Sequence, residues 1–155
     1  MNPVGLHRKG EVDLNRIVEA FSKHPQSRRA GAIATFVGIV RGEPLKEGSG
    51  DVSHLEYEAY VEAALKKMEE IRQAMLSRPG VVEIFIHHII DKLSVGEPSI
   101  FVVVLGGHRQ DVFSVLADTV ERVKREVPIW KKEFTTKDAY WVSTGHNANV
   151  NHSKL

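Results

Sequence analysis

The clearest pattern in the chain is an apolar stripe at helical spacing that stops at a proline. At about 100° per residue, the stripe occupies one face of a helix. Its members are Val112, Leu116, Val120, Val123 and Val127. Pro128 cannot continue a helix, and it disfavours helical geometry at the residue before it. The pattern therefore predicts a helix that ends near Glu126, followed by an extended segment.

Other segments alternate between helical and strand patterns. Asp13 is a predicted N-cap for a short helix, and helical spacing resumes from Val61 until Pro79. Apolar or alternating runs predict strands at residues 30–40, 54–60, 81–90, 99–105 and 139–142. Residues 1–11 carry little pattern. The resulting order, α β β α β β α β β, indicates an α+β fold with three helices and a mixed, mainly antiparallel sheet.

The length of 155 residues suits one domain that can bury its own core. We therefore expect a single domain over residues 1–155. The Asn-, His- and Gly-containing segment from about residue 143 is expected to be a flexible tail.

Composition removes several classes of function. The chain has no cysteine, which excludes disulfides, zinc–thiolate sites and a cysteine nucleophile or persulfide carrier. Lys and Arg total 21 against 20 Asp and Glu, so the net charge of +1 gives no general attraction to nucleic acid or an anionic membrane. With no signal-peptide pattern and no apolar run of about 18 residues, we expect a cytoplasmic protein with neither a membrane nor a nucleic-acid partner.

Cationic side chains gather around the predicted helix stop. Lys124 lies on the flank of the apolar stripe, so it either extends to water or points into a polar cavity at the edge of the core. Lys131 and Lys132 face opposite sides of an extended segment. Only one of these two can therefore share a pocket with Lys124.

Further cations occupy the ends of predicted elements. Arg41 follows a buried strand and precedes a loop rich in Gly, Glu and Ser. Such a position is found at pocket mouths, although the pattern alone favours a solvated strand end. His108 and Arg109 begin the last predicted helix, where free N–H groups and the helix dipole favour an anion. Cations there oppose the dipole unless an anionic ligand arrives.

The adjacent His87 and His88 fall inside a predicted strand, where they face opposite ways and cannot chelate one ion together. We interpret both as structural, and we expect neither a metal nor a cofactor. The marked cations carry no paired acid, which suits binding of a phosphate or carboxylate and stabilisation of charge that develops on it. A lysine with a lowered pKa among other cations also suits general-base or nucleophilic catalysis. Any other nucleophile must come from a partner or cosubstrate.

Several motifs in matching order give a family resemblance across roughly residues 30–142. They are GAIATFVGIVR (31–41), LEY (55–57), IHH (86–88), LSVGE (93–97), GHR (107–109) and KREVPIWKKE (124–133). Together they resemble the large, catalytic subunit of molybdopterin synthase. The resemblance implies an α/β-hammerhead-like fold and a sulfurtransferase that converts cyclic pyranopterin monophosphate to molybdopterin by adding two sulfurs.

The same resemblance implies partners. The sulfur would come from the thiocarboxylated Gly-Gly terminus of a small ubiquitin-like subunit, whose tail threads into a pocket of the large one. Two large subunits would form a homodimer with one small subunit at each end, giving a heterotetramer. The family also places a further arginine beyond the strand that matches residues 140–142, whereas this chain has Ser143, Thr144, Gly145 and His146 there.

Roles for individual residues follow from the resemblance by motif. Lys124 would be the main catalytic lysine, and Lys131 the second one. Arg41 would hold the pterin phosphate, and Phe36 would line the pocket. His108 and Arg109 would join the pocket from the neighbouring large subunit.

Two alternatives stay open from the residues alone. One is a dimeric adaptor that docks a ubiquitin-like protein by sheet addition and does no chemistry itself. The other is a module that binds a phosphate ligand, such as a nucleotide or pterin, without a protein partner.

Overall fold

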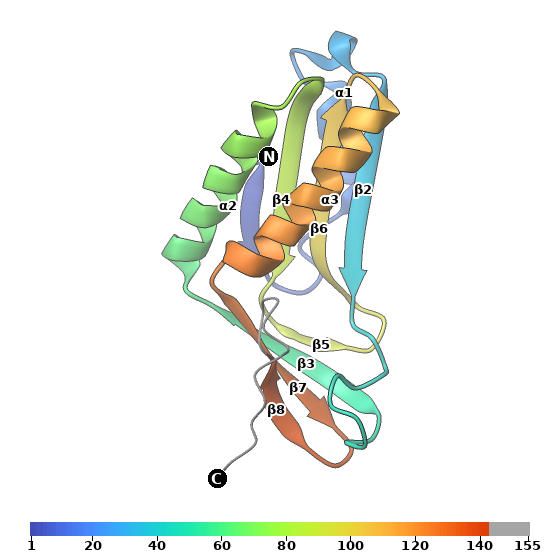
Figure 1. Ribbon diagram of the computed structural model, residues 1–155, viewed down its shortest axis with the longest axis vertical. Helices are drawn as coiled ribbons and strands as arrows, with labels where there is room; N and C mark the ends of the chain where they lie inside the picture. Colours follow the sequence, from blue (N-terminus) through green and yellow to red (C-terminus); the bar gives the residue numbers. More distant parts are fainter. Residues whose placement is uncertain (143–155) are drawn as a thin grey trace.

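Two four-stranded sheets form the framework of the molecule, which is described here over residues 1–142 of a computed structural model (Figure 1). The larger sheet has the strand order β1-β4-β6-β2 and the smaller one β5-β3-β7-β8. The strands of the larger sheet are β1 (Val4–His7), β4 (Val81–Ile89), β6 (Pro98–Gly106) and β2 (Ala32–Ile39). Those of the smaller sheet are β5 (Lys92–Ser94), β3 (Val52–Ala59), β7 (Ile129–Thr135) and β8 (Ala139–Val142). β1 runs parallel to β4, and the other pairs are antiparallel.

Helices cover both faces of the larger sheet. α2 (Val61–Leu76) and α3 (Arg109–Glu126) lie side by side on one face, as Figure 1 shows, and α1 (Leu14–Ser22) packs on the other. The Asp13 side chain caps α1 by accepting a hydrogen bond from the Asn15 amide at 2.9 Å. A short 3₁₀ turn (Ser27–Arg29) leads into β2.

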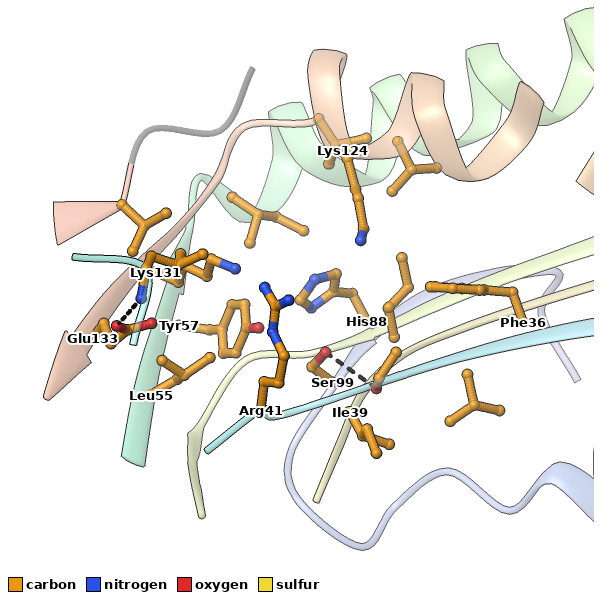
Figure 2. Close-up of a pocket in the computed structure, with 18 of the residues that line it drawn as sticks. Phe36, Ile39, Arg41, Leu55, Tyr57, His88, Ser99, Lys124, Lys131 and Glu133 are labelled. Atoms are coloured by element: carbon orange, nitrogen blue, oxygen red, sulfur yellow. Dashed lines mark hydrogen bonds between the residues drawn. The ribbon is translucent and has the colours of Figure 1, made fainter. Parts of the chain in front are cut away.

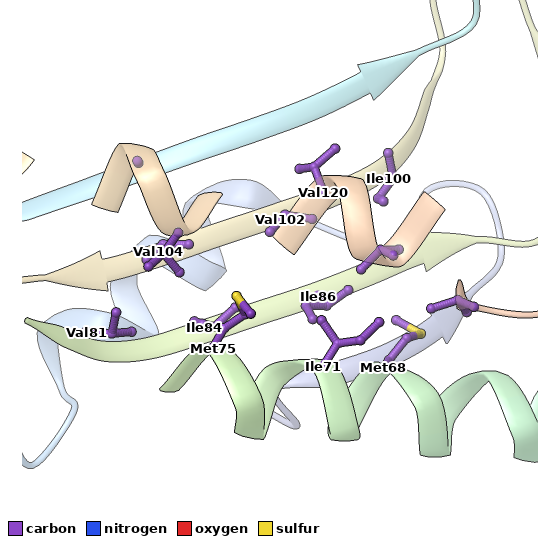
Figure 3. Packing of buried hydrophobic residues seen from close by; sticks show 14 of the residues in the cluster. Met68, Ile71, Met75, Val81, Ile84, Ile86, Ile100, Val102, Val104 and Val120 are labelled. Carbon is purple, nitrogen blue, oxygen red and sulfur yellow. The ribbon is translucent and has the colours of Figure 1, made fainter. Parts of the chain in front are cut away.

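The main core fills the space between the larger sheet and the pair α2 and α3 (Figure 3). Alternate residues of β4 and β6 point toward the helices, and one apolar stripe of each helix points back. This interface includes Met68, Ile71, Met75, Ile84, Ile86, Val102 and Val104, all buried. β4 is buried along its whole length because α1 covers its opposite face.

The smaller sheet is placed by the helix stop at Pro128. α3 ends at Glu126, and Val127 is extended with φ −77° and ψ 128°, so the chain enters β7 within three residues. β7 lies between β3 and β8 below the helices (Figure 1). The last turn of α3 therefore lies directly beside the start of the second sheet.

The α+β class, the three helices and the mixed, mainly antiparallel pairing are confirmed. The predicted order lacked β1 and β5, and the strands divide into two sheets. β1 and β5 have four and three residues, too few to show an alternating pattern. The expected tail from residue 143 lies outside the described residues. Within the described part, no helix combines the length and the apolar character needed to cross a bilayer.

Candidate active site

A cavity of about 680 Å³ lies where the end of α3 meets the two sheets. This volume is typical of a small-molecule site. Four of the six residues marked as site candidates line it, namely Phe36, Arg41, Lys124 and Lys131. Figure 2 shows the three cationic side chains of this set pointing into the same space from separate parts of the fold.

Lys124 enters the cavity from the last turn of α3. Its ammonium lies 5.4 Å from the centre of the Phe36 ring on β2, a distance typical of a cation–π contact. The C-terminal end of the α3 dipole also favours a cation at this position. Of the two orientations left open by the sequence, the structure shows the one directed into the cavity.

Lys131 enters the cavity from β7, and Lys132 does not. Lys132 lies on the outer face of the sheet, where its ammonium is 5.2 Å and 5.7 Å from the ring centres of Phe134 and Trp141. The expectation that only one of the two neighbours joins Lys124 is confirmed. Burial lowers the pKa of Lys131, and the positive charges of Lys124 and Arg41 lower it further, while the Glu133 carboxylate raises it.

Glu133 connects the cavity to the loop that carries Arg41. It is buried, with 3% of its surface exposed, and it accepts a hydrogen bond from the Leu45 amide at 2.9 Å and another from the Tyr140 hydroxyl. These bonds fix the loop after β2 against β7 and β8. They hold the Arg41 guanidinium at the cavity beside Lys131 (Figure 2).

Further polar residues of the cavity wall, besides Glu133, were not predicted as site residues. Tyr57, His88 and Ser99 lie at its base, and the Tyr57 and His88 rings meet edge to face with centroids 5.1 Å apart. Burial raises the pKa of Tyr57. Burial also lowers the pKa of His88 to about 4, and Lys131 and Lys124 add to this effect. His88 is therefore a neutral imidazole in the free protein.

His87 and His88 face opposite sides of β4, as predicted. His87 is in the core behind the sheet, where its Nδ1 lies 2.8 Å from Nε2 of His7. Both histidines are buried, but only His88 lines the cavity. The sequence carried a signal for this position, since His88 alternates with Ile84 and Ile86 on the face of β4 that meets the helices.

His108 and Arg109 do not reach the cavity of the same chain. They begin α3, whereas Lys124 lies in its last turn. A helix rises about 1.5 Å per residue, so Arg109 and Lys124 lie about 22 Å apart along the axis. Both His108 and Arg109 are exposed.

The expectation that no acid accompanies the cations is wrong. Glu133 and Lys131 are two positions apart on β7, so their side chains lie on the same face of the strand. Glu43 and Glu121 also line the cavity. Only Glu133 among these acids affects the pKa of Lys131, and Lys124, Lys131 and Arg41 still offer three cations to an anion. Among the described residues, no group of three or more His, Cys, Asp or Glu side chains is arranged to hold a metal ion.

The geometry thus defines a class of site: an anion-binding cavity in which one lysine has a lowered pKa and several cations can stabilise developing negative charge. Comparison with known proteins identifies a family for the chain. Residues 7–126 match the family model described as MoaE protein. A Pyrococcus abyssi protein described as molybdopterin synthase catalytic subunit is 43% identical over 147 residues, which cover 95% of each chain.

A longer relative and two solved structures agree with this match. A Haloferax volcanii protein described as probable molybdopterin synthase is 40% identical over 131 residues, which cover 84% of this chain but only half of that protein. The crystal structure of molybdopterin synthase from Staphylococcus aureus has a TM-score of 0.80 at 28% identity, covering 92% of this chain and 98% of that one. A Helicobacter pylori complex of subunits 1 and 2 of molybdopterin-converting factor shares the fold, with a TM-score of 0.70 at 21% identity over 92% and 91% of the chains.

The chain belongs to the MoaE family. Its function is that of a molybdopterin synthase catalytic subunit, a sulfurtransferase. The family was predicted from the motifs, and the match confirms it.

Proposed function

We propose that the cavity binds cyclic pyranopterin monophosphate beside the thiocarboxylated tail of a small ubiquitin-like subunit, and that Lys124 and Lys131 promote the transfer of two sulfurs. The observation that carries this proposal is the convergence of Lys124, Lys131 and Arg41 in one cavity of a chain without cysteine. Both guests are anionic, and the cavity offers three cations to receive them. The sulfur must be imported because the chain has no thiol of its own.

Each cation has a distinct part in this proposal. Arg41, on the loop held by Glu133, can form paired hydrogen bonds with the phosphate. Lys124, at the end of α3, binds the incoming thiocarboxylate and stabilises the charge that develops on the acyl group. Lys131, with its lowered pKa, supplies the amine that can exchange a proton during formation and breakdown of the acyl intermediate.

The proposed assembly has a small subunit on each end of a large-subunit homodimer, in the cytoplasm. The Helicobacter pylori structure with the same fold is itself a complex of two subunits. Support for a homodimer comes from β2, an edge strand that exposes Ile33, Val37 and Ile39 by 43%, 37% and 62%. A second copy would also bring the distant His108 and Arg109 to the cavity, as the family resemblance implies.

The experiment is reconstitution of Lys124→Ala with thiocarboxylated small subunit and cyclic pyranopterin monophosphate. We expect the rate of molybdopterin formation to fall by about 10²–10³-fold, the usual effect of removing one group that stabilises developing charge. Lys132→Ala is the matched control, because it removes a lysine of the same segment that faces away from the cavity. Near-normal turnover by Lys124→Ala would exclude the proposed role and favour an adaptor that does no chemistry.

A further inference from the structure

A neutral histidine lies in the same cavity, between the groups assigned so far. Figure 2 shows the His88 ring among the side chains of Lys124, Lys131 and Arg41, at the base of the space they enclose. The ring is held edge to face against Tyr57, and only 8% of the residue is exposed. His88 thus has a fixed position and a limited opening toward the cavity.

The hydrogen bond of the ring determines its tautomer. Nδ1 of His88 lies 2.9 Å from the backbone oxygen of Ile89. A carbonyl oxygen can only accept, so Nδ1 carries the proton and Nε2 carries the free lone pair. Within residues 1–142, Nε2 of His88 has no protein hydrogen-bond partner. Among these residues, the one fully buried side-chain N or O atom without a partner is Nε2 of His87, so Nε2 of His88 is not fully buried. The lone pair of His88 is therefore open to the cavity.

The charges around the ring keep this lone pair available. Besides His88, the titratable groups that line the cavity are Lys124, Glu121 and Arg125 on α3, Lys131 and Glu133 on β7, Arg41 and Glu43 after β2, and Tyr57 on β3. Burial and the two lysines hold its pKa at about 4. An anionic guest would offset the part of this lowering that comes from the lysine charges, while the larger part that comes from burial would stay.

The proposed reaction needs a base of this kind. Once the thiocarboxylate sulfur has bonded to a carbon of the pterin side chain, the terminal carbonyl carbon of the small subunit is still joined to that sulfur. The sulfur stays on the product only if this acyl C–S bond is broken, and water is the available acyl acceptor. Neutral water is a weak nucleophile, so a positioned base accelerates the step.

We propose that Nε2 of His88 accepts the proton of the water that hydrolyses this acyl–sulfur bond. The inference rests on the proposed function and names a further catalytic residue for it. The water oxygen bonds to the acyl carbon as one of its protons passes to Nε2, and the C–S bond then breaks with its electron pair left on sulfur. His88 returns its proton to that thiolate. The new carboxylic acid releases the other proton, and the small subunit leaves as a carboxylate without any oxidant or reductant.

The test separates formation of the acyl adduct from its breakdown. His88→Asn keeps a side-chain amide that can donate to the Ile89 oxygen but has no group in place of Nε2. In a single turnover with thiocarboxylated small subunit and cyclic pyranopterin monophosphate, mass spectrometry follows the covalent adduct between them. We expect the adduct to form at nearly the wild-type rate and to break down about 10²–10⁴-fold more slowly, so that it accumulates.

Two further variants make the test specific. His88→Ala opens space beside the cavity, and added imidazole should restore breakdown of the adduct in proportion to its neutral form. His87→Asn is the matched control, since it alters the adjacent histidine on the opposite face of β4 and should leave the rate of breakdown unchanged. Thermal unfolding and pterin binding show whether each variant is folded.

Unchanged breakdown of the adduct in folded His88→Asn would overturn the proposal, as would a failure of imidazole to accelerate folded His88→Ala. Failure of the proposed function gives a different result. In that case the Lys124→Ala protein would turn over like the wild type, whatever the behaviour of the His88 variants.

Discussion

At the scale of single residues, Lys131 shows how the site is obtained at the expense of stability. Its pKa is lowered first by burial and then by Lys124 and Arg41. Because the unfolded chain then binds the proton more tightly than the folded one, protonation of Lys131 opposes folding. The free energy of unfolding should therefore rise with pH across the window between the lowered pKa and the ordinary value of 10.5.

Replacement by an uncharged side chain of similar length should reverse this effect. We expect Lys131→Met to unfold at the same or a higher temperature than the wild type at pH 7, while sulfur transfer falls by at least about 100-fold. The difference in unfolding temperature should shrink as the pH rises toward 10.5, because the wild-type lysine loses its proton first in the folded state and then, around 10.5, in the unfolded state as well. Thermal unfolding across pH 7–10 measures this, with Lys132→Met as control. A clear loss of stability in Lys131→Met at pH 7 would show that the half-buried Lys131 does not destabilise the folded protein.

At the scale of elements, β7 couples the loop after β2 to Lys131. Glu133 fixes Leu45 and Tyr140, and its charge raises the pKa of Lys131. In Glu133→Gln the neutral amide can still accept both bonds, but more weakly. We expect the free energy of unfolding to fall by about 1–3 kcal/mol, and KM for the pterin to rise as the Arg41 loop loosens.

The same variant also tests the electrostatic link within β7. Without the carboxylate, the pKa of Lys131 falls further, so the part of the pH–rate profile that reports this lysine should move to lower pH. Steady-state rates between pH 6 and 10 measure the shift. Glu58→Gln is the control, since Glu58 is exposed on β3 and does not line the cavity. Movement of the profile to higher pH would contradict this account.

The elements also show what the sequence can and cannot predict. The end of α3 at Glu126 and the opposite directions of Lys131 and Lys132 follow from local rules, namely a proline stop and a period of two. β1 was missed because its four residues pair with β4 about 80 positions away, and local periodicity carries no information on such a partner. For the same reason the cavity itself was not predictable from the residues alone: Arg41 meets Lys131 only because two sheets pack at the end of α3.

At the scale of the whole molecule, one chain leaves part of the predicted site incomplete. His108 and Arg109 lie at the far end of α3 from Lys124, yet the family resemblance assigns them to the pocket. The proposed symmetric dimer would resolve this conflict, because each chain could supply its helix start to the cavity of the other. The exposed aliphatic side chains of the edge strand β2 provide a surface for such a contact.

Mixed dimers give a direct test of this shared site. Lys124→Ala and Arg109→Ala should each be inactive alone, but a dimer containing one chain of each has one cavity with both Lys124 and Arg109 intact. Random exchange of equal amounts makes half of the dimers mixed, so activity should recover to about a quarter of the wild-type value.

The control mixes Lys124→Ala with Lys131→Ala, whose defects fall in the same chain's cavity. In that mixed dimer each cavity keeps one of the two lysines and lacks the other, so the mixture should stay inactive. No recovery in the test mixture would mean that Arg109 serves its own chain or no site at all, and recovery in the control would mean that Lys124 and Lys131 do not act in the same cavity.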